Sequence, residues 1–172
     1  KEHHIQNGGM SRYDKFAYYH KKFLNLDITN KEINNLSILF SNLILDKIYK
    51  SKFIPGAVEF IKNNNNIYKF FIVSATPEIE LINICKKKKI DQYFISILGS
   101  PRKKTKNINL ILEKNKIDKN NCIFIGDSYN DLVAARDSNV KFVGFGNKFN
   151  DNKFKSILKF NEFKNIKKIL NT

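Results

Sequence analysis

Three short polar segments each follow an apolar run, and together they could bind a phosphate group and a hard cation. The segment Ser74-Ala75-Thr76 offers a hydroxyl group and backbone amides at a predicted strand-to-helix turn, which suits an anionic phosphate. A second segment, Arg102-Lys103-Lys104, places cations just before a predicted helix. In a third, Gly126 to Asp131, the carboxylates of Asp127 and Asp131 lie four residues apart and could hold Mg²⁺.

Each of these segments also has a simpler structural explanation. Ser74 could merely cap the following helix, and Lys104 could be an ordinary surface lysine. Asp127 and Asp131 could be a turn residue and a helix-start acid. We favour the chemical interpretation because hydroxyl, lysine and paired acids occur in this order at successive strand ends. In open parallel sheets ligands bind outside the carboxyl ends of the strands, so these side chains should meet at one edge.

The elements that must position these residues divide into a helical part and an α/β part. Apolar residues recur at spacings of three and four from 16 to 23 and from 33 to 48, which predicts two helices, the first capped by Ser11. Pro55 and Gly56 then interrupt the helical pattern. We therefore predict a small helical lobe at residues 1–54 and an α/β domain at residues 55–172.

Apolar runs alternate with amphipathic stretches after residue 55. This alternation predicts a Rossmann-like parallel sheet with helices on both faces. Strands are expected at 67–73, 94–98, 122–125 and 140–145, and helices at 57–62, 78–87, 108–112, 132–136 and 154–170.

The composition narrows the classes of function. The 172 residues are 42% hydrophobic and 13% aromatic, which is enough for a substantial core. No apolar run approaches the ~20 residues that a membrane span needs, and no secretory signal is visible, so no membrane partner is expected. The two cysteines, Cys85 and Cys122, have no CxxC spacing, which predicts neither a disulfide framework nor a thiolate zinc site. The cytoplasm is the expected compartment.

The net charge of +15 raises the possibility of nucleic-acid binding, because basic surfaces release counterions from phosphate backbones. Nearly all of the positive charge is lysine, however, with only Arg12, Arg102 and Arg136 as arginines. Base readout and bidentate phosphate binding favour arginine. Nucleic-acid binding therefore remains a minor alternative.

The order of the three polar segments resembles that of the haloacid-dehalogenase-like hydrolase superfamily, and the resemblance extends over essentially the whole chain. The stretch 72–77 is similar to the second motif of that family, Lys104 to the third, and the stretch 126–131 to the fourth. The resemblance implies hydrolysis of a small phosphorylated metabolite, a phosphate monoester, with Mg²⁺ as the cofactor.

The resemblance also assigns roles to individual residues. Ser74 and the backbone amide of Ala75 would hold the transferred phosphoryl group, and Lys104 would offset its negative charge. Lys103 is the next candidate if the register differs by one residue. Asp127 and Asp131 would position Mg²⁺.

The opening stretch, His4 to Lys15, is similar to the helical cap of phosphoglycolate-phosphatase-like and β-phosphoglucomutase-like members of this family. Cap residues usually select the substrate, so Arg12 is a candidate for contacting an anionic group there. The alternative is that Arg12 forms a structural pair within the cap.

The first motif of the family, an apolar strand followed by Asp-x-Asp, has no counterpart in this sequence. In the family it supplies the nucleophile and the general acid and base, and it lies upstream of this kind of cap. We therefore expect the motif to precede this sequence and the chain alone to be inactive. We also expect a strand-wide gap between the strand leading to Ser74 and the strand leading to Gly126. Two alternatives remain. One is a phosphosugar mutase of the same family, and the other is a non-catalytic binding protein that kept the fold.

Overall fold

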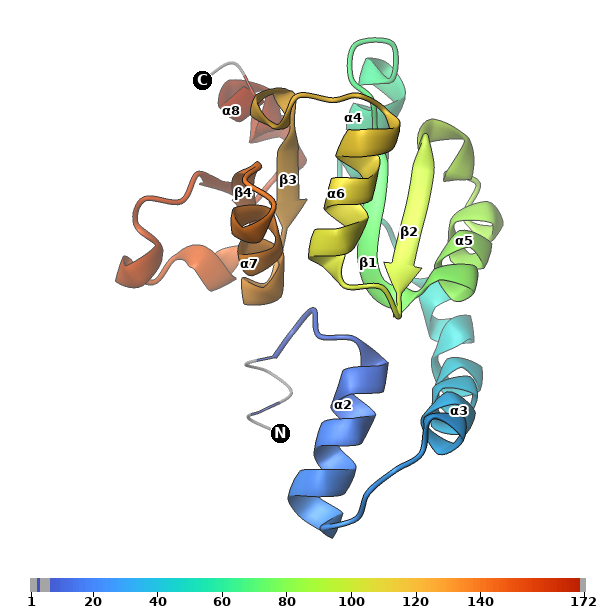
Figure 1. Cartoon of the computed structure of the whole chain (residues 1–172). Coiled ribbons are helices and arrows are strands. Elements are labelled where there is room, and N and C mark those ends of the chain that lie inside the picture. The colour runs from blue at the N-terminus through green and yellow to red at the C-terminus, as the bar shows by residue number, and fades with distance from the viewer. Residues whose placement is uncertain (1–2, 4–6, 171–172) are drawn as a thin grey trace.

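The computed structural model of the chain describes residue 3 and residues 7–170, and its helices and strands form a helical lobe beneath an α/β core (Figure 1). The lobe consists of α2 (Arg12–Tyr19), the π-helical turn η1 (His20–Leu24) and α3 (Asn30–Lys50). The core elements are α4 (Ala57–Asn64), β1 (Phe71–Pro77), α5 (Glu78–Lys87), η2 (Asp91–Tyr93), β2 (Ser96–Ser100), α6 (Lys104–Lys114), η3 (Lys119–Asn121), β3 (Ile123–Gly126), α7 (Tyr129–Asp137), β4 (Lys141–Phe145), η4 (Asn147–Phe149), η5 (Asn152–Phe154), β5 (Lys159–Phe160), η6 (Phe163–Asn165) and α8 (Ile166–Leu170).

Polar side chains begin both lobe helices. The hydroxyl of Ser11 accepts the backbone N–H of Asp14 at 3.2 Å, which confirms Ser11 as the cap of α2. At the start of α3, Thr29 and Glu32 form a reciprocal capping box. These bonds satisfy backbone donors that the first turn of a helix leaves unpaired. The lobe helices therefore have defined starting points although little of their surface is buried.

The strands are parallel and fall into two separate sheets. β1 pairs with β2, and β3 pairs with β4, which in turn pairs with β5. Figure 1 shows β1 and β2 on one side and β3 and β4 on the other. Within the described residues no ladder joins β1 to β3, as the sequence led us to expect. Every residue of these two strands is only half-buried, whereas strands inside a doubly covered parallel sheet are usually buried on both faces.

Two apolar clusters hold the core together. One contains Ile108 of α6 and Ala134 and Ala135 of α7, with Val73 of β1 and Phe124 of β3 packed against it. The other cluster unites α4, α8 and the opposite side of the strands; its buried members are Phe60, Val143, Phe160 and Ile166. Because each cluster includes residues from both sheets or their flanks, helices on both faces connect the two sheets.

The predicted helices at 57–62, 78–87, 108–112 and 132–136 are confirmed as α4, α5, α6 and α7. The first core strand begins later than predicted, at Phe71 rather than Ile67, because the backbone N–H groups of Ile67 and Tyr68 donate to the carbonyl of Asn64 in a turn that ends α4. The strand also continues through Ser74 to Pro77, with an irregular register after Val73.

The prediction of one closing helix at 154–170 is wrong. Lys159 and Phe160 instead form β5 alongside Gly144 and Phe145 of β4, and only Ile166–Leu170 is α-helical. The apolar spacing in this segment imitates a helix, but burial of Phe160 within an aromatic cluster favours an extended backbone there. Among the described helices, none is both long and apolar enough to cross a bilayer.

Candidate active site

Lys104 and Asp131 form the centre of the candidate site. Lys104 is the first residue of α6, and Asp131 lies in the first turn of α7. The Lys104 Nζ atom is 2.5 Å from Asp131 Oδ1, and the two side chains are only 13% and 7% exposed. A helix N-terminus disfavours a cation, so the carboxylate of Asp131 compensates the ammonium group at this position. Lys103, which was the second candidate, is exposed and caps the helix only through its backbone.

Asp131 is held by a second set of bonds. Its Oδ2 atom accepts the backbone N–H of Ser128 at 3.1 Å and the Ser128 hydroxyl at 2.5 Å. Gly126 permits this close packing, since a Cβ atom there would lie 2.3 Å from the Cβ of Asp131. Both carboxylate oxygens of Asp131 are thus engaged by protein donors, and the pair with Lys104 is rigidly placed.

Asp127 has different surroundings. It follows β3 directly, its side chain is 67% exposed, and its Oδ2 atom lies 3.4 Å from Nζ of Lys148. An exposed carboxylate with one distant cation is free to accept a hard metal ion. In the part of the chain that the structure describes, no group of three or more acidic, histidine or cysteine side chains could hold a metal ion. The donor chemistry of Asp127 therefore suits Mg²⁺, but the described side chains alone supply too few ligands.

Ser74 lies within β1, in the irregular part of its register. Its hydroxyl accepts the backbone N–H of Thr76 and donates to the Thr76 hydroxyl, both at 3.2 Å. The carbonyl of Ala75 accepts the hydroxyl of Ser100 at the end of β2, at 2.9 Å. These bonds bend the Ser74-Ala75-Thr76 segment and fix it to its neighbouring strand. No hydrogen bond joins Ser74 to Lys104 or Asp131 among the described residues. Lys104 and Asp131 lie at the starts of the helices that follow β2 and β3, whereas Ser74 is the fourth residue of β1.

A brace at the end of β2 was not anticipated from the sequence. Asn107, which is fully buried in α6, donates to the carbonyl of Gly99 at 3.0 Å and accepts from Arg102 at 2.8 Å. The carboxylate of Glu78 accepts the backbone N–H of Gly99 at 2.9 Å. The brace fixes the loop that leads into Lys104. Asn107 directly precedes the helix predicted at 108–112, and nothing in the sequence indicated that its side chain would be buried.

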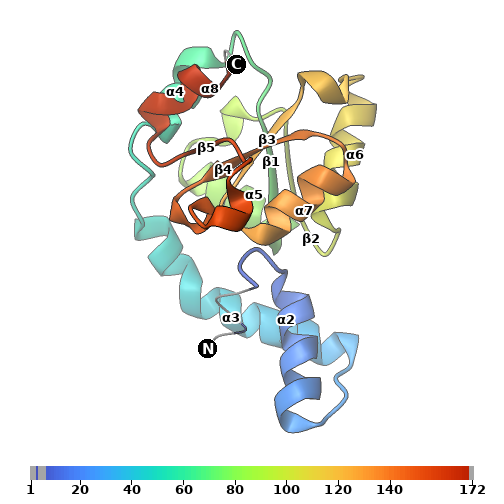
Figure 2. The ribbon, with the colours of Figure 1, turned by 90° about the vertical axis from the view of Figure 1, so that its left-hand side faces the viewer.

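The turn before α2 lies against this cluster. Asn130 of α7 donates to the carbonyl of Gly8 at 2.8 Å. Gly9 has φ +80°, and a Cβ atom there would lie 2.3 Å from the hydroxyl of Ser128 and 3.1 Å from Nζ of Lys104. Figure 2 shows this turn directly beneath α7. The lobe therefore covers the Lys104 ammonium with a backbone that has no side chain to interfere.

Arg12 binds the core rather than lying free in the lobe. Its guanidinium forms two hydrogen bonds with Glu80 of α5, at 2.7 and 2.8 Å, and a third with Ser41 at 2.7 Å. Of the two possibilities drawn from the sequence, structural pairing matches these contacts, although the partner is on α5 rather than in the lobe. His4, the first residue of the stretch that resembled a cap, lies outside the described residues.

Neither cysteine has the lowered thiol pKa that favours a nucleophilic thiolate. Burial raises the pKa of the Cys85 thiol, and the nearby carboxylate of Asp91 raises it further. Burial likewise raises the pKa of Cys122. Thiolates are the reactive form, so these thiols are suited to packing.

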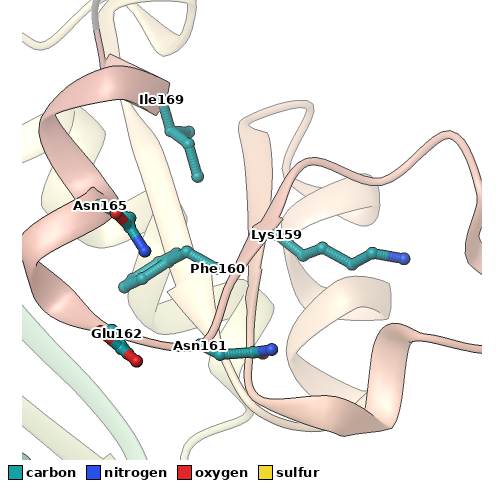
Figure 3. Close-up of a pocket in the computed structure, with 6 residues that line it drawn as sticks. All are labelled: Lys159, Phe160, Asn161, Glu162, Asn165 and Ile169. Atoms are coloured by element: carbon teal, nitrogen blue, oxygen red, sulfur yellow. The ribbon is translucent and has the colours of Figure 1, made fainter.

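A separate hollow of about 430 Å³ opens between β5 and α8 (Figure 3). Its lining residues are Lys159, Phe160, Asn161, Glu162, Asn165 and Ile169. The Lys159 ammonium donates to the carbonyl of Phe149 and points away from the other lining side chains. The hollow lacks the lysine, hydroxyl and acid combination found at the strand ends.

Comparison with known proteins places these observations in a family. The family model for haloacid dehalogenase-like hydrolases matches residues 15–145. Among solved structures, a predicted phosphatase from Clostridium acetobutylicum is 18% identical with a TM-score of 0.76, covering 95% of this chain and 79% of its own. A predicted phosphoglycolate phosphatase from Haemophilus somnus is 21% identical with a TM-score of 0.72 and the same two coverages. A haloacid dehalogenase-like family protein from Streptococcus pneumoniae is 16% identical with a TM-score of 0.71, covering 94% of this chain and 77% of its own. No curated protein matches the sequence.

Proposed function

Because this chain belongs to the family of haloacid dehalogenase-like hydrolases, we propose that it forms the cap and most of the core of a phosphatase. The reaction would be Mg²⁺-dependent hydrolysis of a small-molecule phosphate monoester. Residues 1–54 would act as the cap and residues 55–172 as the core. We propose the cytoplasm as the compartment of this protein, because free thiols such as those of Cys85 and Cys122 stay reduced there.

The observation that carries the proposal is the buried pair of Lys104 and Asp131 at the carboxyl ends of the strands. An ammonium group held in a partly desolvated position stabilises the negative charge of a transferring phosphoryl group more strongly than one in water does. Asp131 keeps the ammonium aimed at the site. Ser74 and the amide of Ala75 would bind the phosphoryl oxygens from the neighbouring strand end.

Mg²⁺ would be bound by Asp127 together with Asp131. Asp127 would be the direct ligand, because its carboxylate is exposed, whereas both oxygens of Asp131 already accept hydrogen bonds. When bound, the ion would neutralise charge on the phosphate oxygens. Remaining ligands would come from water, from the substrate and from the Asp-x-Asp motif that we propose for the longer protein.

The nucleophile of the proposed reaction is not among these 172 residues. We propose that an aspartate on a strand between β1 and β3 forms an aspartyl-phosphate intermediate that water then hydrolyses. The separation of the two sheets and the half-burial of both inner strands support this placement. A strand inserted there would end beside Ser74 and Asp127.

The substrate would be a small phosphorylated metabolite. The Haemophilus somnus structure, described as a predicted phosphoglycolate phosphatase, supports this class. A phosphosugar mutase is the alternative within the family, and it would need stronger exclusion of water from the intermediate. The alternative that is not an enzyme is a binding protein that kept the fold and has no catalytic activity.

The test compares this chain with a longer protein that carries, before residue 1, the Asp-x-Asp strand that we propose. We expect the longer protein to release phosphate from small phosphate monoesters with Mg²⁺ and to lose activity with EDTA. The 172-residue chain should be inactive. Asp127→Asn and Ser74→Ala should each lower turnover in the longer protein at least about 100-fold. Undiminished turnover in EDTA would contradict the metal role, and interconversion of phosphosugars without phosphate release would favour the mutase.

A further inference from the structure

The brace at the end of β2 is a closed ring of polar contacts around Gly99. The backbone N–H of Gly99 donates to the Glu78 carboxylate at 2.9 Å, and its carbonyl accepts the Asn107 amide at 3.0 Å. The Arg102 guanidinium joins these two partners, since its Nη1 atom lies 2.8 Å from Oδ1 of Asn107 and 3.5 Å from Oε2 of Glu78. Both backbone groups of Gly99 are therefore held by side chains that also hold each other.

The brace is fixed to the segment that we propose for phosphoryl binding. A Cβ atom at position 99 would lie 2.5 Å from the carbonyl oxygen of Thr76, so the backbone of Gly99 approaches β1 more closely than a side chain would allow. The next residue, Ser100, donates its hydroxyl to the carbonyl of Ala75 at 2.9 Å. One side of the brace is thus tied to the part of β1 that carries Ser74.

On its other side the brace reaches Lys104 through Asn107. The two residues are three positions apart at the start of α6, so their side chains lie on the same side of the helix. Asn107 is fully buried; a buried amide is costly without hydrogen bonds, and leucine has the higher helix propensity. The bonds of Asn107 therefore account for its place there. They fix α6 against β2, and Lys104 reaches Asp131 from the first residue of that helix.

We propose that Asn107 is a positioning residue for Lys104. By anchoring α6 to Gly99, Asn107 sets the position from which the ammonium meets Asp131, and it keeps that position fixed relative to the part of β1 that carries Ser74. The use of Lys104 toward a phosphoryl group rests on the proposed function, whereas the positioning of the ion pair does not.

The test is a double-mutant cycle on the 172-residue chain, measured by urea unfolding. The cycle combines Lys104→Met with Asp131→Asn. It yields a coupling factor, the ratio by which the pair raises the folding equilibrium constant beyond the two single effects. The cycle is then repeated in an Asn107→Leu background, because leucine keeps the branched shape of asparagine and makes none of its hydrogen bonds. We expect the coupling factor to fall at least about fivefold, since the ammonium is no longer held beside the carboxylate.

Asn64→Leu is the matched control. Asn64 of α4 is also buried, and its amide donates to a backbone carbonyl, that of Phe60, at 2.7 Å. This substitution should lower stability and leave the coupling factor of Lys104 and Asp131 unchanged. Asn107→Ala gives a second background that does not require the site to accommodate leucine, and the same fall is expected there. An unchanged coupling factor in either Asn107 background would overturn the proposal, because Asn107 would then stabilise the fold without placing Lys104. Neither outcome depends on catalytic activity.

Discussion

The Nζ atom of Lys104 lies 2.5 Å from Oδ1 of Asp131, with both residues at the starts of neighbouring helices and almost removed from water. The other oxygen of Asp131 is bound by Ser128. Asp131 therefore has a structural role in addition to the chemical one proposed for it. Its neighbour Asp127 is exposed, so its carboxylate contributes little to the stability of the fold. Substitutions of the two acids should therefore differ in their effect on the free energy of unfolding.

Asp131→Asn should destabilise the chain by about 2–4 kcal/mol, because the buried Lys104 ammonium loses its only close carboxylate among the described residues. Asp127→Asn should change the free energy of unfolding by no more than about 0.5 kcal/mol. Urea unfolding of the three proteins measures both. The double variant Lys104→Met with Asp131→Asn should recover part of the loss, since no charge is then left buried alone. Equal stability of the two aspartate variants would show that the ion pair is not formed.

Gly9→Ala should displace the turn from the site. The added Cβ atom would lie 2.3 Å from the Ser128 hydroxyl, and φ +80° is strained for alanine. Gly146 is a matched control, because it has a similar φ of +84° but a Cβ atom added there would meet nothing within 4 Å. We expect Gly146→Ala to cost about 1–3 kcal/mol from backbone strain alone, because φ +84° with ψ −177° is a conformation that only glycine adopts readily. Gly9→Ala should add loss of hydrogen-exchange protection at residues 7–13. Equal behaviour of the two variants would mean that Gly9 does not touch Ser128.

Both thiols should react slowly with iodoacetamide in the folded chain. Burial raises the pKa of Cys85 and of Cys122, so at pH 8 fewer thiolates are present than in the unfolded chain. Because a raised thiol pKa means that the folded state favours the protonated form, the contribution to stability is present at neutral pH and is lost as the pH rises through the folded pKa. Mass spectrometry of the alkylated protein, with the urea-unfolded chain as reference, measures the difference. Equal rates would contradict burial.

The sequence was most informative where local patterns and chemistry agree. Lys104 and Asp131 were identified from residue type and order, and the structure places them in contact. The partners Asn130 and Glu80 were missed because they contact residues 122 and 68 positions away in the chain. Ser128 was also missed, although its capping box with Asp131 is local and could have been read from the sequence. The prediction of one C-terminal helix at 154–170 was wrong because a long-range contact decides the structure there. Pairing of Phe160 with β4 is a long-range contact that overrides a helical spacing of apolar residues.

The proposed position for the missing strand makes a prediction about the two inner strands. β4 is paired on both sides, by β3 and β5, whereas β1 and β3 each pair on one side only within the described residues. In the 172-residue chain, amides of β1 and β3 that face away from their paired strand should therefore exchange at least about tenfold faster than those of β4. A longer protein that carries the upstream strand should protect β1 and β3 together and leave β4 unchanged, because one parallel strand would bond to both edges. Hydrogen exchange resolved to single amides by NMR makes the comparison. If β1 and β3 are already as protected as β4 in the 172-residue chain, the two sheets pair with each other in solution, and the proposed place for the nucleophile is wrong.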